Sequence, residues 1–247
     1  MKLNNIYTKI RSKKGQIAVL IDPEKTNTLE QIKPLVEKAE FAKIDYFFVG
    51  GSTVARKDFK NATTILKSLT CIPIVIFPGD FQQLSTDADA ILYLSLLSGR
   101  NPEYLIGQHV RYAQDVFHSG IEVIPTAYIL IDGGKQTSVA SVSQTIPIMK
   151  ENLSIALNTT VAGYLQGKKA VYFDAGSGAL NTVNSKLIKQ VSAQLDMAII
   201  VGGGVKTVEQ ISQFQQAGAN VIVIGNKIEE DIDFLLDIKA YCTVKQN

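Results

Sequence analysis

Eight short apolar runs, rich in β-branched residues, restrict how this chain can fold more than any other feature. They are "IAVLID" (17–22), "YFFVGG" (46–51), "IVIFPG" (74–79), "ILYLSLL" (91–97), "EVIPTAYILI" (122–131), "AVYFDAG" (170–176), "MAIIVGGG" (197–204) and "VIVIGN" (221–226). Their apolar residues follow one another without alternating with polar ones, which is typical of parallel strands buried on both faces. The runs therefore predict an α/β protein.

Segments with helical periodicity fill most of the gaps between these runs. In "TLEQIKPLVEKAEFAK" (28–43), one helical face collects Leu29, Ile32, Leu35, Val36 and Ala39. A second segment starts with Thr207 and Gln210 at the spacing of a capping box, and Gly218 marks its end. Each of these segments is long enough to cross from one parallel strand to the next.

Strand and helix alternate eight times within 247 residues, close to the ~250 residues that a (β/α)8 barrel needs. We predict a single (β/α)8 TIM-barrel domain over residues 1–247, in which residues 132–169 form one or two helices and a functional loop. An open doubly wound sheet is the alternative architecture, although it would use fewer buried strands.

The composition excludes several classes of protein. A net charge of +2 gives no electrostatic footprint for nucleic acid. Cys71 and Cys242 form no CxxC pair, which fits a reducing compartment. The N-terminal "MKLNNIYTKIRSKKGQ" lacks the apolar core of a signal peptide, and no apolar run approaches ~20 residues. We expect a cytoplasmic protein.

Polar and glycine residues follow the apolar runs, at the strand ends where barrel enzymes place their active sites. Glycines after the seventh and eighth runs, Gly203, Gly204 and Gly225 with Asn226, suit a phosphate held by backbone N–H groups. Tight turns are the alternative explanation for any one of these positions. The recurrence of the pattern on several strands favours a phosphate site.

Two aspartates at strand ends are candidates for chemistry. Asp22 either caps the following "DPEK" segment or, with the Ser52 hydroxyl, binds Mg²⁺ alongside substrate phosphate oxygens. Asp174 ends the sixth run before "AGSGA", where a carboxylate could orient a hydroxyl and accept its proton, or could cap the next helix.

Seven stretches together resemble the geranylgeranylglyceryl phosphate synthase family, which includes the bacterial heptaprenylglyceryl phosphate synthases. They are "IDPEK", "VGGST", "YLSLLSGRNPEYLIGQH", "IPTAYILIDGGKQTSV", "YFDAGSGA", "IIVGGGVKT" and "VIVIGN", and they cover the chain from Asp22 to Asn226. The resemblance implies a barrel enzyme that joins sn-glycerol 1-phosphate to a polyprenyl diphosphate, here geranylgeranyl diphosphate, through an ether bond to the C3 hydroxyl. It also implies ether phospholipid biosynthesis, a homo-oligomer, and transient membrane contact for product release.

The resemblance assigns roles residue by residue. Asp22 and Ser52 match the Mg²⁺ ligands, and Asp174 and Tyr172 are the predicted catalytic residues. The predicted glycerol phosphate contacts are Tyr172, Phe173, Asp174, Ala175, Gly176, Ser177, Gly178, Ala179, Gly203, Gly204, Gly225 and Asn226. Asp174 departs from the family pattern, which has glutamate, and Leu20 replaces a lysine of the heptaprenyl subgroup.

An allylic diphosphate also requires an apolar groove for its tail. Candidate groove residues are Phe77, Tyr93, Tyr104, Tyr128 and Tyr164, although aromatic side chains also fill ordinary cores. Arg100, Lys135 and Lys206 are candidates for the diphosphate or for surface ion pairs.

Two other functions stay open at this point. One is a sugar-phosphate isomerase or lyase on a phosphate-binding barrel, which would need neither magnesium nor an apolar groove. The other is a non-catalytic sensor of a phosphorylated metabolite, against which the set of Asp22, Ser52 and Asp174 argues. Sequence motifs of chain-elongating prenyltransferases, P-loop nucleotidases and serine hydrolases are absent.

Overall fold

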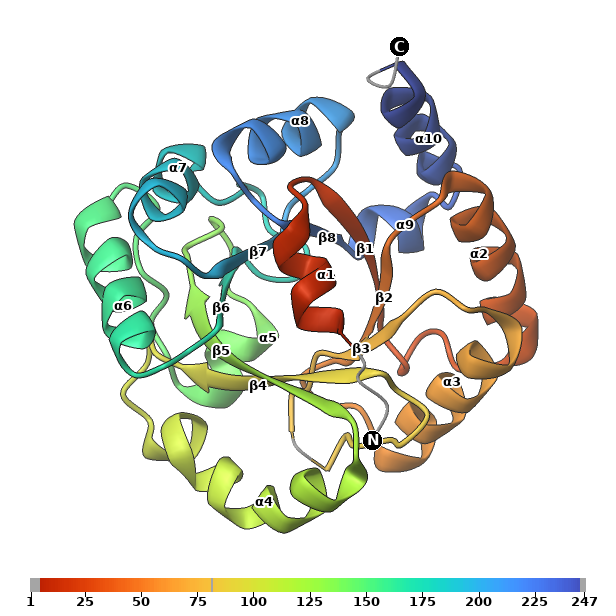
Figure 1. The fold of residues 1–247 in the computed structure, drawn as a ribbon, viewed down its shortest axis with the longest axis horizontal. Coiled ribbons are helices and arrows are strands. Elements are labelled where there is room, and N and C mark those ends of the chain that lie inside the picture. Colours follow the sequence, from red (N-terminus) through yellow and green to blue (C-terminus); the bar gives the residue numbers. More distant parts are fainter. Residues whose placement is uncertain (1–4, 81, 245–247) are drawn as a thin grey trace.

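The computed structural model describes residues 5–80 and 82–244. The first four and last three residues of the predicted domain, and residue 81, lie outside them. The described residues contain a closed barrel in which eight parallel strands pair in sequence order, and β8 pairs with β1 (Figure 1). The predicted (β/α)8 TIM barrel is therefore confirmed.

The strands occupy the cores of the eight apolar runs. They are β1 (Gln16–Ile21), β2 (Tyr46–Val49), β3 (Ile74–Ile76), β4 (Ala90–Leu96), β5 (Glu122–Leu130), β6 (Ala170–Asp174), β7 (Ala198–Gly202) and β8 (Val221–Ile224). Most end before the polar and glycine residues that close each run in the sequence, because those residues turn away from the ladder to form the loops of the pocket.

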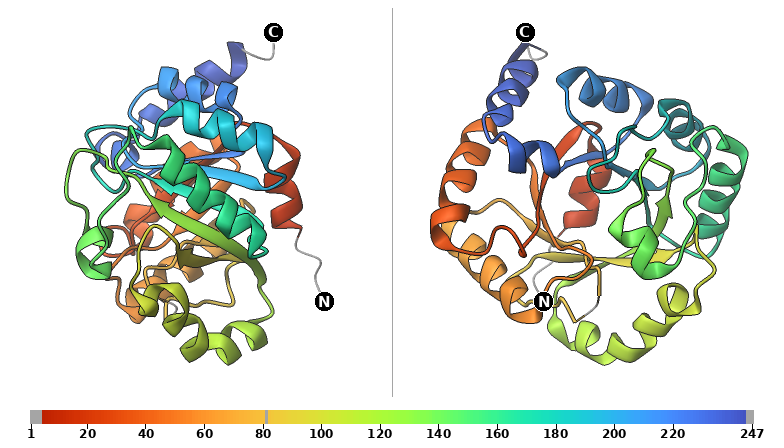
Figure 2. Two further views of the ribbon diagram at one scale, coloured as in Figure 1. Left: turned by 90° about the vertical axis from the view of Figure 1, so that its left-hand side faces the viewer. Right: turned by 180° about the vertical axis from the view of Figure 1, so that it is seen from behind.

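Most of the helices surround the barrel, whereas α1 lies across one of its ends (Figures 1 and 2). They are α1 (Ile6–Ser12), α2 (Leu29–Ala42), α3 (Arg56–Leu69), the π-helix η1 (Glu103–Gly107), α4 (Gln108–Ser119), α5 (Ser138–Ser143), α6 (Leu153–Leu165), α7 (Ser185–Gln194), α8 (Val208–Ala217), α9 (Asn226–Glu230) and α10 (Phe234–Val244). The long connection after β5 holds two helices and a loop, as predicted.

Local sequence signals explain the helix boundaries. Thr207 and Gln210 form the expected capping box, and Gly218 ends α8 in the left-handed conformation. Thr28 and Gln31 form a second capping box that starts α2, and the "DPEK" segment before it is a turn rather than the first turn of a helix. Leu29 is also exposed rather than on the buried face of α2, because it is the first residue of the helix.

Alternation along each strand divides the core into two layers. Tyr172 points into the barrel with Tyr46, Phe48 and Leu92, whereas Phe173 packs outward against the helices. One end of the barrel is closed by α1, whose Ile6 and Ile10 join the inner layer. The left view of Figure 2 shows α1 and α5 at opposite ends of the barrel, and the end on the side of α5 holds the pocket described below.

No helix among residues 5–80 and 82–244 combines the length and apolar character needed to cross a membrane.

Candidate active site

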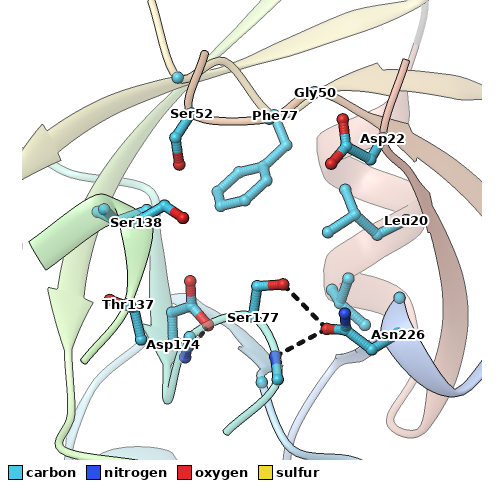
Figure 3. Close-up of a pocket in the computed structure, with 18 of the residues that line it drawn as sticks. Leu20, Asp22, Gly50, Ser52, Phe77, Thr137, Ser138, Asp174, Ser177 and Asn226 are labelled. Carbon is cyan, nitrogen blue, oxygen red and sulfur yellow. Dashed lines mark hydrogen bonds between the residues drawn. The ribbon is translucent and has the colours of Figure 1, made fainter. Parts of the chain in front are cut away.

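A pocket of about 430 Å³ opens at the C-terminal ends of the strands. It brings together Asp22 from the end of β1, Ser52 from the loop after β2, Asp174 from the end of β6, and the loops after β7 and β8 (Figure 3). The two predicted aspartates and the predicted glycine-rich loops therefore share one cavity, although they lie more than 200 residues apart at the extremes.

Glycine-rich backbone forms one side of this pocket. Gly203 and Gly204 have φ angles of 83° and 72°, which only glycine adopts readily, and a Cβ on Gly203 would press on the backbone of the loop after β6. The Asn226 Oδ1 accepts hydrogen bonds from the Gly178 N–H (2.8 Å) and the Ser177 hydroxyl (3.0 Å). These two bonds join the loops after β6 and β8 into one concave surface.

Asp174 lines the pocket and is only 7% exposed. Its Oδ2 accepts a hydrogen bond from the Tyr128 hydroxyl at 2.7 Å, and its Oδ1 accepts one from the Gly176 N–H, also at 2.7 Å. Burial raises the pKa of the Asp174 carboxyl, while these two hydrogen bonds act in the opposite direction. A fixed carboxylate with an increased proton affinity is suited to accept a proton from a substrate hydroxyl.

Three aromatic rings form the wall beside Asp174. Phe77 stacks on Tyr172 with ring centroids 4.7 Å apart, and Tyr128 meets both rings edge-on at 5.7 Å. A Cβ on Gly202 would clash with the Tyr172 hydroxyl, so the glycine at the end of β7 makes room for that ring. Burial raises the pKa of both tyrosines, which keeps their hydroxyls neutral near pH 7.

Asp22 and Ser52 enter the pocket from its opposite rim, on either side of Phe77 in Figure 3. The Asp22 Oδ1 accepts a hydrogen bond from the Glu24 N–H at 3.1 Å, and its Oδ2 lies 4.0 Å from the Lys25 ammonium. Burial raises the pKa of Asp22 as well. The aspartate thus holds a turn, as the capping alternative expected, and also presents carboxylate oxygen to the cavity.

The pocket continues from this polar region onto an apolar surface. That surface is lined by Leu94 and Leu96 of β4, Tyr104 of η1, and Val139 and Val142 of α5. Two of its neighbours from the long connection after β5, Thr137 and Ser138, were not singled out in the sequence. Their polarity and small size gave no signal that distinguished them from ordinary loop residues.

The structure corrects several predicted contacts. Phe173 faces the outer helices because it alternates with Tyr172, and Ala175 and Ala179 are buried in the same outer layer rather than lining the pocket. Tyr93 lines a separate groove outside the barrel, and Tyr164 is exposed on α6.

Two of the three basic residues proposed to bind the diphosphate line the pocket, and one does not. The Arg100 guanidinium donates to the Leu97 and Gly99 carbonyls and does not line the pocket, whereas Lys135 and Lys206 do. Tyr128, expected in the apolar groove, lines the pocket but also binds Asp174.

Comparison with protein families matches residues 8–243 to the PcrB family. Among curated relatives, the geranylgeranylglyceryl phosphate synthase of Chitinophaga pinensis is 44% identical over 239 residues, covering 95% of this chain and 94% of that protein. The protein of the same name from Korarchaeum cryptofilum is 35% identical and covers 93% of each chain.

Among solved structures, the (S)-3-O-geranylgeranylglyceryl phosphate synthase of Thermoplasma acidophilum superimposes with a TM-score of 0.88 at 33% identity. The match covers 97% of this chain and 96% of that one, and that crystal structure contains the substrate sn-glycerol-1-phosphate.

Proposed function

The chain belongs to the PcrB family, which confirms the resemblance drawn from its sequence, and on that premise we propose that it is a Mg²⁺-dependent prenyltransferase of ether phospholipid biosynthesis. It joins sn-glycerol 1-phosphate to geranylgeranyl diphosphate and releases diphosphate. One observation supports this most strongly: the pocket that holds Asp174 runs from glycine-rich backbone to an apolar surface.

The glycerol phosphate belongs at the glycine-rich side. Backbone N–H groups at Gly203 and Gly204, in the loop after β7, can approach phosphate oxygens closely, and Lys206 adds positive charge beside them. With the phosphate held there, the C3 hydroxyl reaches toward Asp174. Asp174 orients that hydroxyl and accepts its proton as the new C–O bond forms.

The donor set at the other rim fits Mg²⁺. Asp22 supplies one carboxylate and Ser52 one hydroxyl, and magnesium characteristically binds through one or two carboxylates together with substrate phosphate oxygens and water. Among the described residues no group of three or more His, Cys, Asp or Glu side chains is arranged to hold a metal, so substrate oxygens complete this set. When bound, the ion neutralises charge on the departing diphosphate.

The apolar surface receives the prenyl chain. Leu94, Leu96, Val139 and Val142 extend the pocket away from Asp22, and Phe77 and Tyr172 offer ring faces next to the reacting carbon. Positive charge that develops on an allylic carbon is stabilised by such ring faces. This arrangement supports a diphosphate bound near Asp22 and a tail bound near α5.

We also propose a homo-oligomer that contacts the membrane transiently to release its product. Apolar side chains are exposed on α6 and the segment before it, among them Ile146, Met149 and Leu165, and a second copy of the chain would cover them. A cytoplasmic location remains a prediction from the sequence.

A labelled assay tests the proposed reaction. Purified protein is incubated with radiolabelled sn-glycerol 1-phosphate and geranylgeranyl diphosphate, and extraction into organic solvent measures the ether product. We expect product with Mg²⁺ and none after EDTA. Product that persists in EDTA would remove the metal from the proposal, and absence of any product would favour a sugar-phosphate isomerase, a lyase or a sensor.

A further inference from the structure

A second hollow, the outer groove, lies outside the barrel, between β4 and the helices η1 and α4. It measures about 600 Å³ and is lined by Tyr93, Ser95 and Leu97 of β4, Leu105 and Ile106 of η1, His109, Val110 and Ala113 of α4, and Gln166 and Lys168 beyond α6. The same strand and helices also line the active-site pocket, but with Leu94, Leu96, Tyr104 and Gln108. Alternate residues therefore build two separate cavities on the two sides of one wall.

Two basic side chains meet at the inner end of the outer groove. The Lys168 ammonium donates a hydrogen bond to the Ser95 hydroxyl at 2.7 Å, and that hydroxyl lies 3.5 Å from His109 Nε2. Ser95 and His109 are 4% and 6% exposed. Burial together with the nearby Lys168 charge lowers the pKa of His109 to about 4, so Lys168 is the cation of the pair near neutral pH.

Lys168 has no acidic partner in the part of the chain that the structure describes. Every ion pair among the described residues involves other side chains, and burial is the cause that lowers the pKa of Lys168. A partly buried ammonium without a counter-charge is unfavourable, and a bound anion would relieve that cost. In contrast, Lys67 of α3 pairs with Asp89 at 2.8 Å.

Apolar side chains surround this cation on the solvent side. Leu97, Leu105 and Ala113 form the walls of the outer groove, and Ile106 and Val110 at its mouth are 57% and 71% exposed. An inorganic anion would leave these walls in contact with water. An anion that carries an apolar chain would bind Lys168 and cover them together.

We propose that the outer groove binds an anionic amphiphile, with its acidic head on Lys168 and Ser95 and its apolar chain along Leu105, Ile106 and Val110 toward solvent. This site is separate from the active-site pocket and takes a ligand of the chemical class of single-chain phosphate or carboxylate lipids.

Titration calorimetry below the critical micelle concentration tests the site on the full-length protein. The ligands are decyl phosphate and decanoate, with decanol and inorganic phosphate as the controls that lack the charge or the chain. The variants are Lys168→Met, Lys168→Arg, which keeps the charge, and Lys169→Met, a matched control at the adjacent exposed lysine. Ser95→Ala serves as a second variant if Lys168→Met does not fold.

We expect the wild type, Lys168→Arg and Lys169→Met to bind the charged amphiphiles with similar affinity. Lys168→Met should weaken binding at least about tenfold and Ser95→Ala about threefold, because hydrogen bonds to a charged group are lost or loosened. The relative affinities of decyl phosphate and decanoate then show which head group the site prefers.

Several results would overturn the proposal. They are equal affinity of Lys168→Met and wild type, decanol binding as tightly as decyl phosphate, and absence of saturable binding to the wild type. Displacement of the amphiphile by sn-glycerol 1-phosphate would assign the binding to the barrel pocket instead. A change in the number of chains by light scattering, without saturable binding, would make the groove an interface between copies.

Discussion

The two ends of the barrel bury similar polar side chains for opposite purposes. At the end closed by α1, Asn220 accepts a hydrogen bond from the Ile199 N–H at 2.9 Å and donates one to the Lys13 carbonyl, and Asp45 accepts one from the Ile17 N–H. At the open end, Asp174 and Asp22 also hold backbone N–H groups, but their carboxylates face a cavity. At the closed end the polar side chains satisfy the hydrogen bonds of buried backbone groups, whereas at the open end the carboxylates are also available to a ligand.

We therefore expect the polar residues of the closed end to contribute mainly to stability and those of the open end mainly to activity. Replacing a polar group at the closed end leaves a buried backbone group without its partner, which costs folding free energy. Replacing a carboxylate at the open end removes a group whose ionised form burial already disfavours, as the raised pKa values of Asp22 and Asp174 indicate. Variants at the closed end should therefore lose thermodynamic stability, and variants at the open end should lose enzymatic activity.

The largest effect is expected for Asp22→Asn. Loss of the carboxylate weakens the proposed metal site, and kcat/KM should fall about 10³-fold or more, equivalent to ~4 kcal/mol of transition-state stabilisation. The amide still accepts the Glu24 N–H bond, so the melting temperature should stay close to that of the wild type. A large loss of thermal stability with residual activity would show that Asp22 is mainly a cap.

Asp174→Asn should lower kcat by about 10² to 10³-fold in the labelled assay, because the amide cannot accept the proton of the hydroxyl. Folding raises the pKa of Asp174, so ionisation of this carboxyl disfavours the folded state as the pH rises above its unfolded value. The neutral amide should therefore leave thermal stability at pH 7 unchanged or increase it. An unchanged kcat would mean that another group, or none, accepts the proton.

Asn220→Ala tests the prediction that residues of the closed end contribute to stability rather than to activity. Asn220 is fully buried, and its loss leaves the Ile199 N–H without its acceptor, which should cost about 2 to 3 kcal/mol of unfolding free energy. Urea denaturation measures this change, and kcat at a temperature where the variant is folded should equal that of the wild type. A large fall in kcat without loss of stability would contradict the division between the ends.

The sequence predicted the barrel and the place of its glycine-rich loops. Buried parallel strands leave their pattern in consecutive residues, and the loops that border the pocket leave theirs as glycines at strand ends, as at Gly203 and Gly204. Both signals are local, and the barrel topology then brings the strand ends together without further information.

The side-chain part of the site was less predictable because it depends on direction. Phe173 and Tyr172 are neighbours in the sequence, yet only Tyr172 faces the pocket, and that depends on the register of β6. Tyr128 gave no sign in the sequence that its hydroxyl would bind Asp174, 46 residues away. Lys168 and Ser95 likewise come together only through the packing outside β4.

Tyr128→Phe tests how the open end holds its carboxylate. The Tyr128 hydrogen bond lowers the pKa of Asp174 against the effect of burial, so its removal should raise that pKa further. The acidic limb of the pH profile of kcat/KM should therefore move to higher pH, with about a fivefold loss of rate near neutral pH from a lost hydrogen bond. A uniform loss of rate with an unmoved limb would indicate that Tyr128 contacts the substrate instead.

The smallest effect is expected for Glu122→Gln at the closed end. The Glu122 carboxylate accepts hydrogen bonds from the Ile6 and Tyr7 N–H groups at 2.7 and 3.0 Å, where a negative charge favours the start of α1. The amide keeps one acceptor and loses the charge, so we expect a loss of about 0.5 to 1 kcal/mol in urea denaturation. Because α1 lies at the far end of the barrel from Asp174, kcat should not change. Loss of activity in this variant, at a temperature where it is folded, would mean that the closure by α1 is coupled to the pocket and that the two ends are not independent.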